Sequence, residues 1–197
     1  MKKMKNTNSK KLAVASFIFL TFGATFSACS SSSSSNEHSH HEATSNEEEI
    51  HKETISVETA YASVNTETVD QLLTGYLKIK DALIATDAET TKNSAKAMVA
   101  EIDSENSIFN HIVDIANKIS DSDGVEDQRV KFESLSKEIY EVVKASKAST
   151  TLYKQYCPMA FDNKGAFWLS TSEEVLNPYF GDKMLRCGSV QETISVE

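Results

Sequence analysis

Four successive stripes of apolar residues between residues 69 and 143 constrain the fold more than any other feature of this sequence. Apolar side chains recur there at i, i+3, i+4 and i+7, the spacing that places them on one face of an α-helix. We expect helices near residues 69–83, 88–102, 108–119 and 124–143, with Asp87 as the N-cap of the second. No proline interrupts these segments.

Short breaks between the four segments predict an all-α fold, in which an antiparallel four-helix bundle buries the apolar stripes. Residues 151–190 have a different character, because they hold both prolines and the only tryptophan of the chain. We expect a mostly irregular cap there, rich in aromatic residues and sulfur. Within it, Ala166–Ser170 is a candidate strand that pairs with residues near Ala160 across a turn.

The first 28 residues have the composition of an export signal. Five lysines and no acid precede a short apolar run, and small residues lead to Cys29. This segment resembles a bacterial lipoprotein signal, although Phe26 stands where such signals usually carry leucine. The resemblance implies cleavage before Cys29, lipid modification of that cysteine, and anchoring to a membrane of the bacterial cell envelope (periplasm or outer membrane). The alternative is an uncleaved membrane anchor.

The segment that follows, residues 29–65, is predicted to be a flexible tether, because its serine-rich and acidic composition cannot bury enough apolar surface to fold. It contains four histidines, which suit either a solvated spacer or loose capture of divalent ions. The predicted divisions are a signal (1–28), the tether (29–65), the bundle (66–150), the cap (151–190) and a tail (191–197).

Net charge limits the class of partner. The chain has 20 basic and 29 acidic residues, a net charge of −9, and loss of the five signal lysines would make it −14. A surface this acidic repels phosphate backbones. We therefore do not expect nucleic acid as a partner.

One hexapeptide occurs twice. Glu-Thr-Ile-Ser-Val-Glu at residues 53–58 returns unchanged at residues 192–197. Both copies alternate polar and apolar residues as short strands do, but six residues do not make a repeat architecture. The sequence alone gives no account of this recurrence.

The cap carries two compact groups of soft sulfur donors. Cys157 and Met159 flank a proline, and Met184 and Cys187 have the i, i+3 spacing that brings two side chains to one side of a helical turn. Thiolate and thioether are the ligand types that select Cu(I), whereas zinc prefers cysteine and histidine. Convergence of the two groups would create a soft-metal site.

Longer stretches carry a family resemblance: GYLKIKDAL (75–83), DQRVKFESLS (127–136), YCPMAFDNKGAFWLS (156–170) and NPYFGDKMLRCG (177–188). With them, residues 69–188 resemble a helical domain of unknown function from bacterial envelope lipoproteins, which is also found attached to periplasmic adaptors of copper and silver efflux pumps. Tyr-Cys-Pro-Met is similar to the opening of heavy-metal-binding modules. The chain departs from those modules at Ala160, where histidine is usual, and no second Cys-x-x-Cys follows.

The resemblance implies a lipid-anchored envelope protein that binds Cu(I) or Ag(I) for metal homeostasis or efflux, with efflux adaptor or pump components as partners. Its metal ligands would be Cys157, Met159, Met184 and Cys187. The alternative is a Cys157–Cys187 disulfide that staples the cap of an interaction or adaptor module, with both methionines as ordinary core. His111, the only histidine of the predicted bundle, is a further candidate ligand or a solvent-edge residue.

An enzyme is not expected. The sequence shows no Ser/His/acid set, no glycine-rich phosphate loop and no His-Glu-x-x-His helix. We therefore assign no catalytic residue.

Overall fold

The computed structural model describes residues 60–103 and 106–196, all of which belong to a single compact unit. The predicted signal, Cys29 and most of the predicted tether lie outside these residues. Within the described ranges, no helix has the length and apolar character needed to cross a membrane.

Four long helices form near the predicted positions. They are α2 (Thr66–Ile84), α3 (Ala88–Glu101), α4 (Asn110–Asp121) and α5 (Val125–Ala145), and a short 3-10 turn, η1 (Ser107–Phe109), precedes α4. Side chains cap two of these helices, as expected for Asn and Asp. Asn65 accepts the Thr68 N–H at 2.9 Å, and Asp87 accepts the Thr90 N–H at 2.9 Å, which confirms Asp87 as an N-cap.

The C-terminal part is a three-stranded antiparallel sheet. Its strands are β1 (Leu152–Cys157), β2 (Ala166–Ser170) and β3 (Ser189–Ile194), in the order β2-β1-β3. Two short turns, α6 (Ala160–Asn163) and η2 (Gly181–Lys183), lie between the strands. Cys157 pairs with Ala166, and Leu152 pairs with Ile194, so β1 is the central strand.

The sheet overturns the predicted fold class. The all-α prediction of an antiparallel four-helix bundle with an irregular cap is wrong, because residues 151–194 form strands that pair over long sequence distances. Ala166–Ser170 is a strand as predicted, but its partner is β1 rather than the region near Ala160. The cap is therefore a sheet layer with one long loop, residues 171–188.

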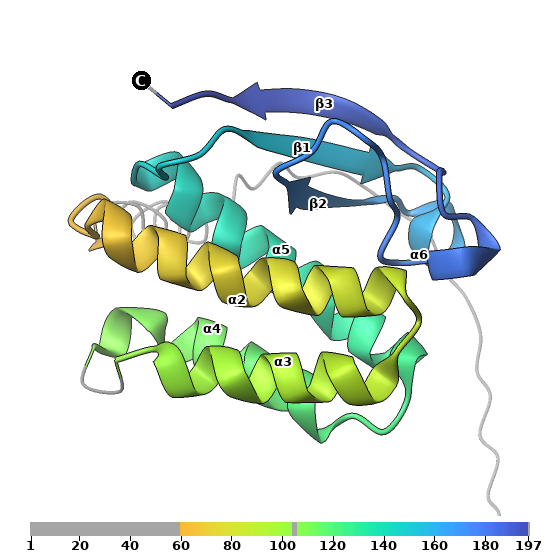
Figure 1. The fold of residues 1–197 in the computed structure, drawn as a ribbon, viewed down its shortest axis with the longest axis horizontal. Helices are drawn as coiled ribbons and strands as arrows, with labels where there is room; N and C mark the ends of the chain where they lie inside the picture. The colour runs from red at the N-terminus through yellow and green to blue at the C-terminus, as the bar shows by residue number, and fades with distance from the viewer. Residues whose placement is uncertain (1–59, 104–105, 197) are drawn as a thin grey trace, which may run out of the picture. The chain divides into compact units, whose positions relative to one another are not determined.

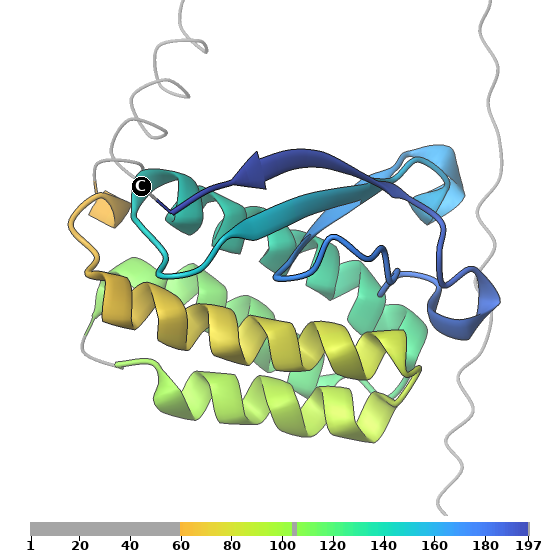
Figure 2. The ribbon, with the colours of Figure 1, turned by 45° about the horizontal axis from the view of Figure 1, so that its top comes forward.

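The sheet lies against α5, and α3 and α4 lie on the other side of α2 and α5 (Figures 1 and 2). Aromatic contacts join the layers. Tyr140 of α5 meets Phe167 of β2 edge to face at 5.4 Å, and Tyr76 of α2 stacks on Phe132 of α5 at 5.0 Å. Burial of these apolar faces supplies most of the stability of helices that would be marginal alone.

A buried arginine fixes the long loop to the helices. The Arg129 side chain is 1% exposed, and its Nε donates to the Pro178 carbonyl at 2.9 Å. Its Nη2 donates to the Leu83 carbonyl at 3.2 Å and to the Thr86 hydroxyl at 3.2 Å. Five donors in a planar fork allow one guanidinium to join the end of α2, the start of α5 and the loop.

Candidate functional site

Cys157 is the last residue of the central strand, and its side chain is fully buried. The strand ends there because Pro158 has no backbone N–H to continue the ladder. The chain then turns through α6 and returns as β2, whose first residue, Ala166, pairs with Cys157. Pairing to β2 on one side holds the Cys157 thiol in a fixed place.

Cys187 lies on a turn at the end of the long loop and is partly buried. Its N–H donates to the Met184 carbonyl at 3.1 Å, so the predicted turn over Met184–Cys187 does form. Gly188 follows with φ of +143° and lies against the Tyr156 carbonyl, which an added Cβ would approach to 2.8 Å. A glycine at this position lets the chain pass from the turn into β3.

Asn177 positions the turn that carries Cys187. Its side chain is fully buried, its Nδ2 donates to the Cys187 carbonyl at 2.8 Å, and its N–H donates to the Leu185 carbonyl at 2.8 Å. Its Oδ1 accepts the Tyr179 N–H at 2.8 Å. No periodic pattern in the sequence indicates this role. The signal available was an Asn before Pro178, a turn cue that does not reveal burial.

The two thiols meet. Cys157 Sγ and Cys187 Sγ are 2.8 Å apart, although 30 residues separate them in sequence, and both are free cysteines. The distance between the two sulfurs lies between those of a disulfide and of two thiolates that share a metal ion. A disulfide has sulfurs about 2.05 Å apart, whereas two thiolates on one tetrahedral ion at about 2.3 Å each lie about 3.8 Å apart.

The contact also changes the acidity of the pair. Hydrogen bonding to Cys157, burial, and the charge that a neighbouring thiolate would carry raise the pKa of Cys187 to about 11. At neutral pH Cys187 is therefore protonated, and any ligand that needs its thiolate must displace a proton.

The two methionines are less buried than Cys157. Met159 is 47% exposed, and Met184 is partly buried on the Cys187 turn. Neither belongs to the buried core of the described residues, so a role for Met159 as ordinary core is wrong. The structure brings the two cysteines into contact.

His111 lies elsewhere, on α4. Its side chain is 64% exposed, and its Nδ1 lies 3.0 Å from the Glu138 carboxylate of α5. Together they line a hollow with Lys118, Lys131 and Lys137. The described residues contain no group of three or more His, Cys, Asp or Glu side chains that could hold a metal ion.

Comparison with protein families found one match. Residues 72–151 match a family described as Protein of unknown function (DUF3347). The matched range begins within α2 and stops just before β1, so it includes part of α2 and all of α3, α4 and α5, and it excludes Cys157 and Cys187. No curated protein and no solved structure matches the chain.

Proposed function

We propose that this protein binds a soft monovalent ion, Cu(I) or Ag(I), with the Cys157 and Cys187 thiolates as ligands. The single observation that carries the proposal is the convergence of the two free thiols to 2.8 Å from distant parts of the chain. Two thiolates are a donor set that such ions prefer to hard cations. The role is binding rather than catalysis.

Access to the pair supports capture from solution. Cys157 is buried, but Cys187 is partly exposed, and its turn would have to move by roughly 1 Å to admit an ion between the sulfurs. Met159 is exposed two residues beyond Cys157 and provides a mobile thioether. Met184 lies in the same turn as Cys187. We propose both as additional ligands.

Proton release sets the pH dependence. Because the pKa of Cys187 is raised to about 11, binding of an ion at neutral pH releases the Cys187 proton. Apparent affinity should therefore increase as the pH rises toward 11, where proton competition ends.

The cellular setting is part of the proposal. The N-terminal segment resembles a lipoprotein signal with Cys29 as the lipidated residue, which would place the protein at the bacterial envelope, anchored to a membrane. A net charge of −9 favours local enrichment of cations. Transfer to or from heavy-metal efflux components, for homeostasis or export, follows from the family resemblance.

The decisive experiment is an anaerobic Cu(I) competition titration of the full chain, reduced and with its thiols counted. We expect one ion per chain, loss of tight capture in Cys157→Ser and in Cys187→Ser, and weaker capture in Met159→Leu. His111→Ala serves as the matched control and should bind as the parent does. Absence of capture by the fully reduced parent would overturn the proposal.

A second function is favoured by the same short contact. An oxidant that removes two electrons and two protons from Cys157 and Cys187 would join the sulfurs, which are already 2.8 Å apart. The cross-link would close a loop of 30 residues and add about 3–4 kcal/mol to the free energy of unfolding. The protein would then be an envelope interaction module with a stapled sheet layer. It would show no reactive thiol at these positions and a lower melting temperature after reduction.

A further inference from the structure

The repeated hexapeptide has a structural role in one of its two copies. In Glu192–Glu197, the first three residues (Glu, Thr, Ile) are the last three of β3 and pair with the central strand β1. The other copy, Glu53–Glu58, has the same six residues in the same order. The place that receives one copy therefore has the right chemistry for both.

The place that receives Glu192 is formed by α5 and β1. The Glu192 carboxylate accepts the Tyr140 hydroxyl at 2.7 Å and Lys144 Nζ at 2.9 Å. Lys154 of β1 lies opposite Glu192 in the strand register, and its Nζ lies 4.0 Å from the centre of the Tyr140 ring. Two cations and a hydroxyl therefore select a carboxylate at this position of the strand.

The two residues after Glu192 are also matched by residues of β1. Thr193 lies opposite Tyr153, a pairing of a β-branched with an aromatic residue, and Ile194 lies opposite Leu152. Ile194 is partly buried against the hydrophobic core, and Leu152 belongs to that core. An acid, a threonine and an isoleucine in sequence are thus each matched by a partner.

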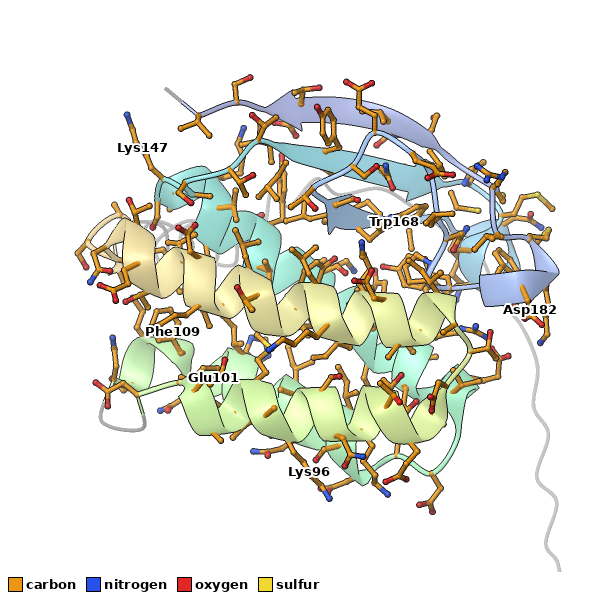
Figure 3. All side chains as sticks on the ribbon, viewed as in Figure 1. Lys96, Glu101, Phe109, Lys147, Trp168 and Asp182 are labelled. Atoms are coloured by element: carbon orange, nitrogen blue, oxygen red, sulfur yellow. The ribbon has the colours of Figure 1, made fainter. Side chains whose placement is uncertain are left out.

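Chain connectivity from Tyr61 would allow Glu53–Glu58 to reach this place in the direction of β3. Tyr61, whose carbonyl accepts a hydrogen bond from the Ser146 hydroxyl, lies beside the end of α5. Ile194 lines a hollow with that same Ser146 and with Lys147. Lys147 marks this end of the unit in Figure 3, opposite Asp182. Five residues lie between Ile55 and Tyr61, and the six Cα-to-Cα steps can span about 20 Å.

We propose that the edge of β1 opposite β2 is a binding site for a strand with the sequence Glu-Thr-Ile. Glu53–Ile55 of the same chain competes there with Glu192–Ile194. Glu53 takes the position of Glu192 against Tyr140 and Lys144, and the segment runs in the direction of β3 before continuing into Tyr61. The two copies are alternative occupants of one site.

The strand that would be displaced is weakly held. Among the described residues β3 lies at the edge of the sheet and pairs with no strand other than β1, and a register irregularity between Lys154 and Gln155 interrupts that pairing. Its first three residues are exposed. Since the three matched residues make equal contacts in either copy, the balance depends on the unlike residues that precede them, Ser189–Gln191 and Ile50–Lys52.

The exchange can be detected by pairs of prolines. Successive N–H groups of a strand point to opposite edges, so two adjacent prolines always remove one that faces β1. We compare Thr54→Pro/Ile55→Pro, Thr193→Pro/Ile194→Pro and the combined variant in the full chain. Ala43→Pro/Thr44→Pro, which places the same change outside the hexapeptide, is the matched control.

Hydrogen exchange of β1 is the readout. We expect β1 to remain protected in each single pair, because the intact copy fills the site, and to exchange at least tenfold faster in the combined variant. The melting temperature of the combined variant should fall by more than the sum of the decreases in the two single pairs. If only the combined variant is unfolded, that is the strongest form of the same result. Loss of β1 protection in Thr193→Pro/Ile194→Pro equal to that in the combined variant would overturn the proposal, as would additive melting shifts.

Discussion

The hydroxyl of Tyr76 in α2 accepts the backbone N–H of Leu169 in β2 at 3.0 Å, so one phenol joins the helical layer to the sheet. The same oxygen lies 2.9 Å from the Ser136 hydroxyl of α5. Tyr76 is fully buried, and burial raises the pKa of its hydroxyl far above the ordinary value, so it stays neutral. The contact satisfies a buried edge N–H of β2 that has no neighbouring strand on that side.

Tyr76→Phe should therefore lower the free energy of unfolding by about 1–3 kcal/mol, because it leaves the Leu169 N–H without its partner. Chemical denaturation monitored by circular dichroism measures this change. Tyr61→Phe is the matched control, since the Tyr61 hydroxyl reaches Glu138 at only 3.4 Å. An equal loss in both variants would argue against a special role for the Tyr76 contact.

Arg129→Met should destabilise the protein by about 2–4 kcal/mol, because the Pro178 and Leu83 carbonyls lose a charged donor while remaining buried. The loop that carries Cys187 should also exchange its amide hydrogens faster than in the parent. Lys183→Met is the control. It removes a cation that contacts Glu126, and the Lys183 side chain is 65% exposed. That control should change stability by less than about 1 kcal/mol.

Gly181→Ala should be destabilising by about 2 kcal/mol, since φ at Gly181 is +55° and an added Cβ would lie 2.3 Å from Thr86 Oγ1 and 2.6 Å from Arg129 Nη2. Gly124→Ala is the comparison, because nothing lies within 4 Å of a Cβ there. Thermal unfolding of the two variants should differ clearly. Equal melting temperatures would show that the loop can move away from Arg129 without cost.

Alkylation of Cys187 should be at least tenfold slower at pH 8 than that of a free cysteine. With the pKa raised to about 11, the reactive thiolate is scarce below that pH and accumulates only as the pH rises. Mass spectrometry of the Cys187 peptide after timed iodoacetamide treatment gives the rate. Cys157→Ala removes the hydrogen-bond partner that is the largest cause of the shift, and it should accelerate the reaction. An unchanged rate in that variant would contradict the assigned cause.

Helical periodicity was sufficient to locate α2 to α5, because each helix buries one face and exposes the other. The same reasoning failed for β1. This strand is central, and its buried residues, Leu152, Gln155 and Cys157, do not follow a period of two. A register irregularity between Lys154 and Gln155 shifts the pattern by one residue and breaks the alternation by which a strand is recognised. The all-α prediction was wrong for that reason.

The candidate site was predictable only as a list of soft donors. Spacing along the chain indicated a turn over Met184–Cys187, which forms. The meeting of Cys187 with Cys157 was expected from their chemistry, as shared metal ligands or as a disulfide, and not from their spacing. That approach depends on Asn177, a buried side chain that acts through the loop backbone. Contacts made by long loop closure leave no periodic signal in sequence.

The unequal burial of the two cysteines implies an order of events. Cys157 is fixed in the central strand with no exposed surface, whereas Cys187 lies on a turn at the rim. If the protein carries an ion as proposed, an incoming donor molecule would meet Cys187 first, and a receiving thiol would displace Cys187 before Cys157. Hand-over would then proceed by stepwise ligand exchange, with the bond to Cys157 formed last on loading and broken last on release, so that this inner bond sets the residence time of the cargo.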